Sequence, residues 1–385
     1  MIPYGRQDIN ENDIDAVIDV LKSDYLTQGQ IVPEFEGKIA KYCGAKYSVA
    51  SNSATSALHI ACLALNIGKA DIVWTSVISF VASANCALYC GAKIDFIDID
   101  PVTNNLSINH LKKKLILAEK NNTLPRAIIP VHLSGQSCDM YEIHELSKKY
   151  NFKIIEDASH AIGGEYYSKK IGACEYSDIT VFSFHPVKII TAGEGGMSLT
   201  NNKELFNRMM KFRNHGITKD SNEFKNNSSG AWYYEQIKLG FNYRLSDIHA
   251  ALGLSQFNRL DNFIEKRNLL AKKYSQCLSE SPIKLPVVKK DRISSWHLYI
   301  IKIDLNSCTR SHNEIFNLLR REGIGVQLHY IPIPMHPYFK SLGFNMDDYI
   351  NAKSYYQQAL SIPIYPLMTE AEQNKVLGAI KKIVY

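Results

Sequence analysis

Residues 47–75 read YSVASNSATSALHIACLALNIGKADIVWT and contain in order a strand pattern, a helix pattern and a second strand pattern. The short apolar runs Tyr47–Ala50 and Ile72–Thr75 are typical of buried strands. The segment Ser53–Leu65 between them is long enough for a helix and begins with small polar residues. This stretch therefore predicts a strand–helix–strand unit, which is typical of a mostly parallel sheet.

The same alternation continues as far as Leu199. We predict further strands at Ile94–Ile97, Ala127–Val131, Lys153–Glu156, Ile179–Phe182 and Met197–Leu199. We predict further helices at Ser79–Tyr89, Ile108–Ala118 and Met140–Tyr150. Alternating strands and helices indicate an α/β fold with a mostly parallel central sheet covered on both faces. Ligands of such sheets bind beyond the carboxyl ends of the strands, where the helices begin.

The length of 385 residues favours two domains. Past Leu245 a long helical pattern reaches Leu278, and a strand at Trp296–Ile303 and further helices follow it. We therefore predict a large domain over residues 1–250, with an N-terminal helical segment, and a smaller C-terminal α/β domain over residues 251–385. The polar stretch Thr218–Gly230 predicts an exposed loop.

Composition excludes several classes of protein. The net charge is only +6, and no basic block is longer than Lys112–Lys114, so we expect no nucleic-acid partner. Polar residues interrupt the apolar runs, and no apolar signal core opens the sequence, so we expect a cytoplasmic protein without a membrane partner. None of the eight cysteines forms a Cys-x-x-Cys pair, and we expect reduced thiols and no metal site.

Three clusters follow strands of the predicted sheet. Asn52–Ala57 opens a helix with small hydroxyl residues, which suits a phosphate but also suits an ordinary helix cap. Asp157 ends a strand, with His160 three residues later; the carboxylate could cap a helix, bind a metal with His160 or hold a protonated heterocycle. No third metal ligand lies nearby in the sequence, which weighs against the metal.

The third cluster contains Lys188. Apolar residues precede it and the glycine-rich turn Gly193–Gly196 follows it, surroundings that desolvate an amine and favour a Schiff-base lysine. Ser183 adds a possible phosphate donor. A phosphate-binding helix start, a carboxylate for a pyridinium nitrogen and a lysine for an aldehyde are together what pyridoxal 5′-phosphate requires, and we predict this cofactor.

Four phrases carry a resemblance to a known family: NSATSAL (52–58), EDASHAIGG (156–164), FSFHPVKIITAGEGG (182–196) and GFNYRLSDIHAALGLSQ (240–256). They closely resemble the pyridoxal-phosphate-dependent sugar aminotransferases of the DegT/DnrJ/EryC1/StrS family. The resemblance runs nearly end to end and implies the fold-type I, aspartate aminotransferase-like architecture. It also implies a homodimer with shared active sites.

The resemblance implies a role for each matching residue. Lys188 matches the Schiff-base and proton-transferring lysine, Asp157 the partner of the pyridinium nitrogen, and His160 a residue that supports them. The other cofactor-binding matches are Ala54, Thr55 and Ser183 for the phosphate, Phe80 for ring stacking, Gln136 for the ring hydroxyl, and Asn242 contributed by the neighbouring subunit. The substrate-binding matches are Tyr4, Asp24, Tyr25, Leu26, Thr27, Gln327, Leu328, His329, Tyr330 and, with its role left open, His185.

The family has a dehydrating branch in which histidine replaces the lysine, so Lys188 implies amination. The phrases IPYGRQDI (2–9), SDYLTQG (23–29) and SFVASANCALYCGA (79–92) favour the branch that acts in pseudaminic acid biosynthesis. That branch implies a UDP-linked 4-keto-6-deoxy amino sugar as acceptor and L-glutamate as donor. The alternative is a C4 aminotransferase for another nucleotide-linked ketosugar, of the bacillosamine, legionaminic or dTDP-sugar type. The phosphate loop departs from many relatives by having Ala54 where they have glycine.

Overall fold

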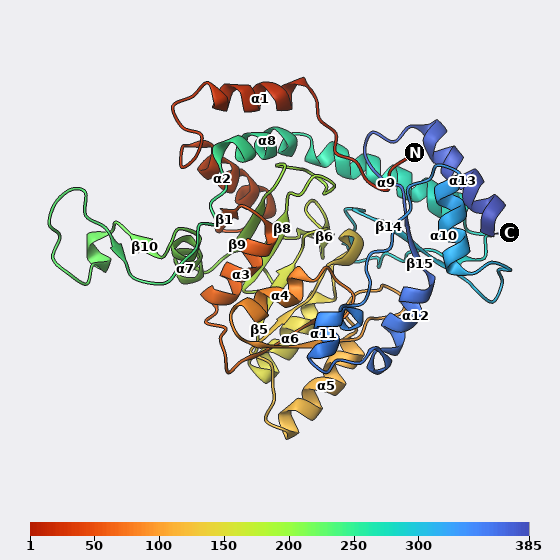
Figure 1. The fold of residues 1–385 in the computed structure, drawn as a ribbon, viewed down its shortest axis with the longest axis horizontal. Coiled ribbons are helices and arrows are strands. Elements are labelled where there is room, and N and C mark those ends of the chain that lie inside the picture. Colours follow the sequence, from red (N-terminus) through yellow and green to blue (C-terminus); the bar gives the residue numbers. More distant parts are fainter. Residues whose placement is uncertain (385) are drawn as a thin grey trace.

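The computed structural model describes residues 1–384 and contains a central seven-stranded sheet formed by residues 47–200 (Figure 1). The strand order is β1 (Tyr47–Ser51), β9 (Gly196–Thr200), β8 (Ile179–Ser183), β5 (Lys153–Asp157), β4 (Ala127–Ile129), β2 (Ile72–Ser76) and β3 (Lys93–Ile97). Only β9 runs antiparallel to its neighbours β1 and β8; the other paired strands are parallel. The predicted α/β fold with a mostly parallel central sheet is confirmed.

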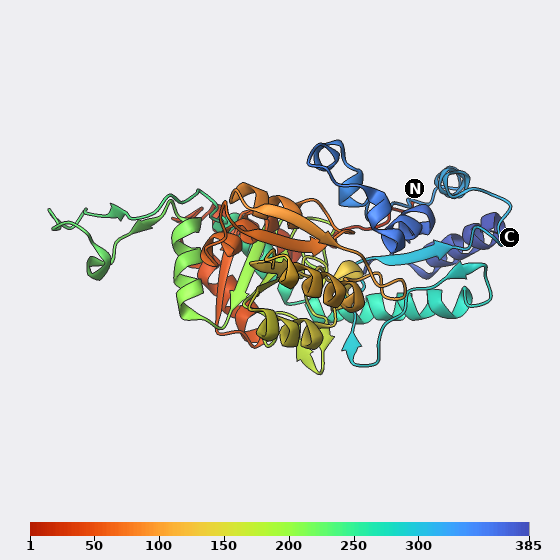
Figure 2. The same ribbon diagram turned by 90° about the horizontal axis from the view of Figure 1, so that it is seen from below.

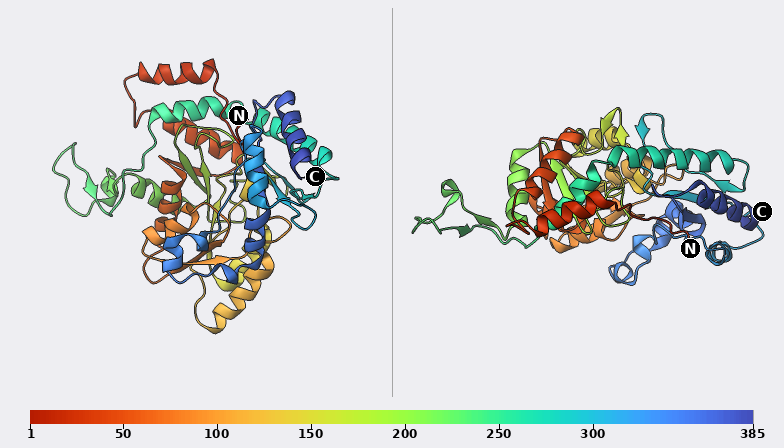
Figure 3. Two further views of the ribbon diagram at one scale, coloured as in Figure 1. Left: turned by 45° about the vertical axis from the view of Figure 1, so that its right-hand side comes forward. Right: turned by 90° about the horizontal axis from the view of Figure 1, so that it is seen from above.

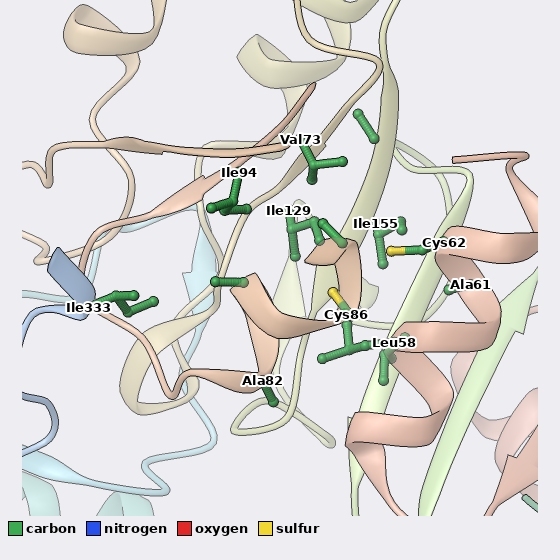
Figure 4. Packing of buried hydrophobic residues seen from close by; sticks show 14 of the residues in the cluster. Leu58, Ala61, Cys62, Val73, Ala82, Cys86, Ile94, Ile129, Ile155 and Ile333 are labelled. Atoms are coloured by element: carbon green, nitrogen blue, oxygen red, sulfur yellow. The ribbon is translucent and has the colours of Figure 1, made fainter. Parts of the chain in front are cut away.

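Both faces of this sheet are buried. The α-helices of residues 31–213 are α2 (Ile31–Cys43), α3 (Ala54–Ala64), α4 (Ala82–Tyr89), α5 (Ile108–Lys120), α6 (Met140–Tyr150) and α7 (Lys203–Arg213). Alternate strand residues enter two different apolar clusters: Ile129 and Ile155 pack with α3 and α4, as Figure 4 shows, whereas Ile128 and Ile154 pack with α5 and α6. Because side chains alternate along a strand, runs of apolar residues were needed to bury both faces.

The predicted long helix after Leu245 is divided into α8 (Asp247–Phe257) and α9 (Leu260–Cys277). Arg259 lies at the break and forms ion pairs with Asp8 at 2.8 Å and Asp13 at 2.5 Å. Asp13 belongs to α1 (Glu11–Leu21), which lies along α8 (Figure 1) and begins with a capping box between Asn10 and Asp13. These contacts attach the N-terminal helical segment to α8 and to the break before α9.

A further apolar cluster lies in the C-terminal part of the chain and is formed by residues of α9, α10 (His312–Arg321), α13 (Glu370–Val384) and β14 (Tyr299–Ile303). There β14 pairs with β12 (Ile283–Lys284) and β15 (Ala359–Ile362). Ile2 joins this cluster and bridges to Ile324, so the first residues of the chain contact its last third. The domain division at residue 250 stays a prediction.

The remaining elements are short. They are β6 (Glu165–Tyr166), β7 (Lys169–Lys170), β13 (Arg292–Ile293), β10 (Ile217–Thr218), β11 (Glu235–Gln236), α11 (Pro337–Ser341) and α12 (Ile350–Gln358), with 3₁₀ turns at Leu133–Gly135, Ser221–Glu223, Ile333–Met335 and Met346–Asp348. The hairpin of β10 and β11 projects from the body of the molecule in all views (Figures 1, 2 and 3) and carries the predicted exposed loop. Within residues 1–384, no helix combines the length and the apolar character that crossing a bilayer requires.

Candidate active site

A cavity of about 650 Å³ lies beyond the carboxyl ends of β5 and β8 and at the start of α3. Its size is within the range usual for small-molecule sites. It brings together most of the residues that the sequence pattern singled out. These are Tyr4, Ala54, Thr55, Phe80, Asp157, His160, Ser183, His185, Lys188, His329 and Tyr330.

The first wall is the amino-terminal end of α3. Ser53 caps this helix by accepting a hydrogen bond from the Ser56 N–H at 3.1 Å. The N–H groups of Ala54 and Thr55 have no hydrogen-bond partner within residues 1–384. Unpaired amides at a helix start carry partial positive charge and suit an anion. A Cβ at Gly196 would lie 2.4 Å from the Ser53 carbonyl oxygen and 2.5 Å from the Ala54 nitrogen, so β9 approaches this helix start closely.

The second wall is the end of β5, where Asp157 is buried. Its Oδ2 accepts a hydrogen bond from the Ser83 hydroxyl at 2.6 Å, and its Oδ1 accepts one from the Ser159 N–H at 3.1 Å. Ser83 also lies 2.6 Å from the Ser79 hydroxyl. A carboxylate oxygen accepts more than one hydrogen bond, so Asp157 is held in a fixed orientation and can still accept a donor from a ligand.

The third wall carries Lys188, which follows β8. Its ammonium group makes no ion pair or hydrogen bond with any part of residues 1–384. Burial lowers the pKa of Lys188 from its ordinary value of 10.5 to about 8, while the Asp157 charge acts in the opposite direction. An amine with this pKa is partly neutral near physiological pH, so it can act as a nucleophile or a base.

His160 and Tyr330 form a hydrogen-bonded pair in the cavity. The Ser134 N–H points to His160 Nδ1 at 3.3 Å, so Nδ1 is the acceptor and the ring proton resides on Nε2. Nε2 lies 3.1 Å from the Tyr330 hydroxyl oxygen and donates to it. Burial keeps the pKa of His160 well below its ordinary value, with Lys188 and His329 adding to the effect. Because the Tyr330 hydroxyl oxygen accepts this bond, its own proton points away from His160.

Gln136 is engaged outside the cavity. Its side-chain nitrogen donates to the Val287 carbonyl at 2.9 Å, and its side-chain oxygen accepts from the Lys289 N–H at 3.1 Å. These two bonds hold the 287–289 loop, and the side chain does not line the cavity. Its contact with a ring hydroxyl stays a prediction.

Asp24, Tyr25, Leu26 and Thr27 also lie outside the cavity. They form an exposed segment after α1, with Thr27 bridged to Ser246. Asn242 is exposed, pairs with Asn214 and does not line the cavity of its own chain. The contribution of Asn242 to the site of a second copy, and that of Asp24–Thr27 to substrate binding, stay predictions.

A second hollow of about 580 Å³ adjoins the first and shares Tyr4, Ser79, Phe80, His329 and Tyr330 with it. It contains the two remaining predicted substrate residues, Gln327 and Leu328. The Phe80 ring is 58% exposed, and its centroid lies 6.1 Å from that of Tyr330. This aromatic pair therefore stands where the two hollows meet.

Sequence reasoning did not single out Ser79 and His297, which line the cavity, or Ser83, which donates to Asp157. Ser83 lies in α4, and Ser79 lies in the segment before this helix, 2.6 Å from the Ser83 hydroxyl. His297 enters from the segment before β14 and had no signal in the sequence. The observed strand β14 begins three residues later than the predicted strand Trp296–Ile303, because Trp296 has a left-handed φ of 48° that is incompatible with an extended strand.

Comparison with known proteins supports the resemblance to the aminotransferase family. The family model described as the DegT/DnrJ/EryC1/StrS aminotransferase family matches residues 7–381. The UDP-4-amino-4,6-dideoxy-N-acetyl-beta-L-altrosamine transaminase of Campylobacter jejuni subsp. jejuni is 42% identical over 389 residues, which cover 100% of this chain and 98% of that protein.

Two solved structures agree along the whole chain. Helicobacter pylori PseC, an aminotransferase involved in the biosynthesis of pseudoaminic acid, has a TM-score of 0.90 and 32% identity and covers 100% of this chain and 99% of its own. A putative sugar aminotransferase of Streptococcus pneumoniae in its PMP form has a TM-score of 0.91 and 27% identity, with the same coverage; the same protein has also been solved in its PLP form. The chain belongs to the DegT/DnrJ/EryC1/StrS aminotransferase family.

Proposed function

We propose that the chain is a pyridoxal 5′-phosphate-dependent aminotransferase of pseudaminic acid biosynthesis. It transfers the amino group of L-glutamate to C4 of a UDP-linked 4-keto-6-deoxy-N-acetylhexosamine and forms UDP-4-amino-4,6-dideoxy-N-acetyl-β-L-altrosamine. The observation that carries the proposal is that three groups line one cavity. They are the unpaired Lys188 amine, the oriented Asp157 carboxylate, and the unpaired backbone N–H groups at the start of α3. The Campylobacter relative supports the choice of sugar.

The residues present fit the cofactor at each of its three polar positions. The free N–H groups of Ala54 and Thr55 and the Ser183 hydroxyl would hold the phosphate. Asp157 would accept a hydrogen bond from the protonated ring nitrogen and so keep it protonated, and Lys188 would react with the aldehyde. When bound, the cofactor supplies an electron sink that makes a carbon–hydrogen bond next to nitrogen acidic.

Lys188 moves the protons of both half-reactions. In its neutral form it removes a proton from the α-carbon of glutamate, and in the second half-reaction it returns a proton to C4 of the sugar. Burial lowers the pKa of Lys188 to about 8, so at neutral pH the neutral amine is a substantial minority form. Ser83 and Ser159 hold Asp157 so that its charge faces the ring nitrogen.

The substrate would extend from this cavity into the adjoining hollow. Phe80 and Tyr330 lie where the hollows meet, and Tyr330 has a hydroxyl proton available for a sugar oxygen because it accepts from His160. Gln327 and Leu328 would then line the nucleotide end. Asn242 of a second copy would complete the phosphate site in a homodimer.

The test is an assay with L-glutamate and each epimer of the UDP-4-keto-6-deoxy sugar. Only the L-arabino epimer should be aminated, and the Lys188→Ala variant should be inactive with both. Conversion of the other epimer alone, or of a dTDP-linked ketosugar alone, would favour the alternative acceptor and contradict the proposed sugar. Failure of glutamate to bleach the visible absorbance of the holoenzyme would contradict the aminotransferase reaction itself.

A further inference from the structure

His297 is a buried histidine whose ring is left without a partner. It lines the main cavity, is 3% exposed, and its ring centroid lies 4.4 Å from that of His160. Its Nδ1 is buried and forms no hydrogen bond, and no other residue within 1–384 bonds to its ring. Buried polar groups in proteins are nearly always satisfied, so a ring that no described residue bonds at Nε2 is open to a bound molecule at that nitrogen.

The groups that face His297 are predominantly basic. They come from four separate elements: His160 after β5, Lys188 after β8, Arg267 in α9, and His329 from the segment before α11. Burial, and then these neighbours, hold the pKa of His297 well below its ordinary value, so its ring is neutral when no anion is bound. The acidic groups of the cavity wall are Asp157 and Glu194; serine and backbone donors already engage Asp157, and Glu194 is exposed.

Arg267 holds the backbone that carries His297. It is buried, and its guanidinium donates to the carbonyls of Trp296 and Ile364, each at 3.0 Å. It forms no ion pair with any acidic residue within 1–384, so its positive charge is not compensated there. Trp296 has the left-handed φ of 48°, and the arginine contacts fix this turn and with it the direction of the next residue. A rigid imidazole backed by a fixed cation suits an anion.

We propose that His297 binds the α-carboxylate of the amino donor. This inference rests on the proposed function, because that reaction brings a carboxylate next to the carbon from which Lys188 removes a proton. The cofactor phosphate has its own place at the start of α3, and the sugar diphosphate would lie toward the second hollow. On binding, the ring takes up one proton from solvent, and the imidazolium donates a hydrogen bond to a carboxylate oxygen.

Calorimetric titration of the holoenzyme with glutarate tests this proposal. Glutarate carries carboxylates but no amino group, so it can bind without reacting. We expect wild-type protein to take up a proton on binding, seen as a dependence of the heat on buffer ionisation, and to bind more weakly as pH rises. His297→Asn should raise the glutarate dissociation constant and the glutamate KM by at least about tenfold, equivalent to about 1.4 kcal/mol. It should leave the KM of the sugar unchanged.

The control is His144→Asn, a histidine of α6 that packs against Tyr176 and is remote from the cavity residues; it should match wild type. His297→Gln, whose amide N–H donors lie one carbon further from the backbone than those of Asn and so nearer the position of Nε2, should be intermediate. Unchanged glutarate binding in His297→Asn would overturn the inference, and so would an increase confined to the KM of the sugar. If no ketosugar is aminated but glutarate binding still depends on His297, the carboxylate site stands while the proposed acceptor fails.

Discussion

Gly196→Ala is the substitution for which the structure makes the sharpest prediction. Gly196 lies in β9 between Ser51 of β1 and Ser183 of β8. An added Cβ would lie 2.4 Å from the Ser53 carbonyl oxygen and 2.5 Å from the Ala54 nitrogen. Ordinary contacts of a Cβ are 3.4 Å or longer, so the backbone at the start of α3 must move by about 1 Å.

This displacement acts on both stability and cofactor binding. Forcing a methyl group into a packed site costs about 1–3 kcal/mol of the free energy of unfolding. The same shift turns the Ala54 and Thr55 amides away from a bound phosphate. Losing one hydrogen bond to a charged group costs about 1.5–3 kcal/mol, which raises the dissociation constant by roughly 10- to 150-fold.

The assay is a titration of apoprotein with pyridoxal 5′-phosphate, followed by visible absorbance, together with thermal unfolding of the apoprotein. Gly378→Ala is the matched control, because a Cβ there meets nothing within 4 Å in α13. It should bind the cofactor as wild type does and be slightly more stable, by about 0.5–1 kcal/mol. Cofactor affinity of Gly196→Ala within twofold of wild type would refute the role assigned to this helix start.

Three further substitutions test individual groups. In apoprotein below pH 8, Lys188→Met should raise Tm, because wild type carries a desolvated charge there. The difference in Tm between the variant and wild type should vanish as pH rises from the folded pKa of about 8 past the ordinary value of 10.5. A difference in Tm that does not change with pH would contradict this. Ser83→Ala leaves Asp157 Oδ2 without its buried donor and should lower the free energy of unfolding, measured by denaturant titration, by about 1–3 kcal/mol. An unchanged free energy of unfolding would show that the 2.6 Å contact does not contribute to stability. Tyr330→Phe should raise the KM of the ketosugar about tenfold in steady-state kinetics and leave cofactor affinity unchanged, because the Tyr330 hydroxyl accepts from His160 and directs its own proton at the substrate. An unchanged KM would refute a hydrogen bond from this hydroxyl to the substrate.

Much of the fold could be predicted because the central strands are buried on both faces. Such strands read as continuous apolar runs, and the predicted bounds of β1, β2, β3, β5, β8 and β9 fall within one or two residues of those observed. Lys188 and Asp157 were found for the same reason, because they follow two of these strands at the carboxyl edge of the sheet.

The parts that could not be predicted depend on contacts between distant segments. Gln136 is turned toward the 287–289 loop, which no local pattern near residue 136 reveals. His297 reaches the cavity only because the turn at Trp296 is held by Arg267 from another helix. The break at Arg259 likewise follows from ion pairs with residues at the start of the chain. Tertiary hydrogen bonds and ion pairs decided these details, whereas strand position was decided locally.

The most direct measurement is borohydride reduction of the purified holoenzyme, followed by proteolysis and mass spectrometry. We predict that a reduced pyridoxyl phosphate group is attached to the ε-nitrogen of Lys188 and that prior incubation with glutamate prevents the labelling. Attachment to a different lysine, or no attachment in protein that carries the visible cofactor absorbance, would contradict the assignment of this cavity as the active site.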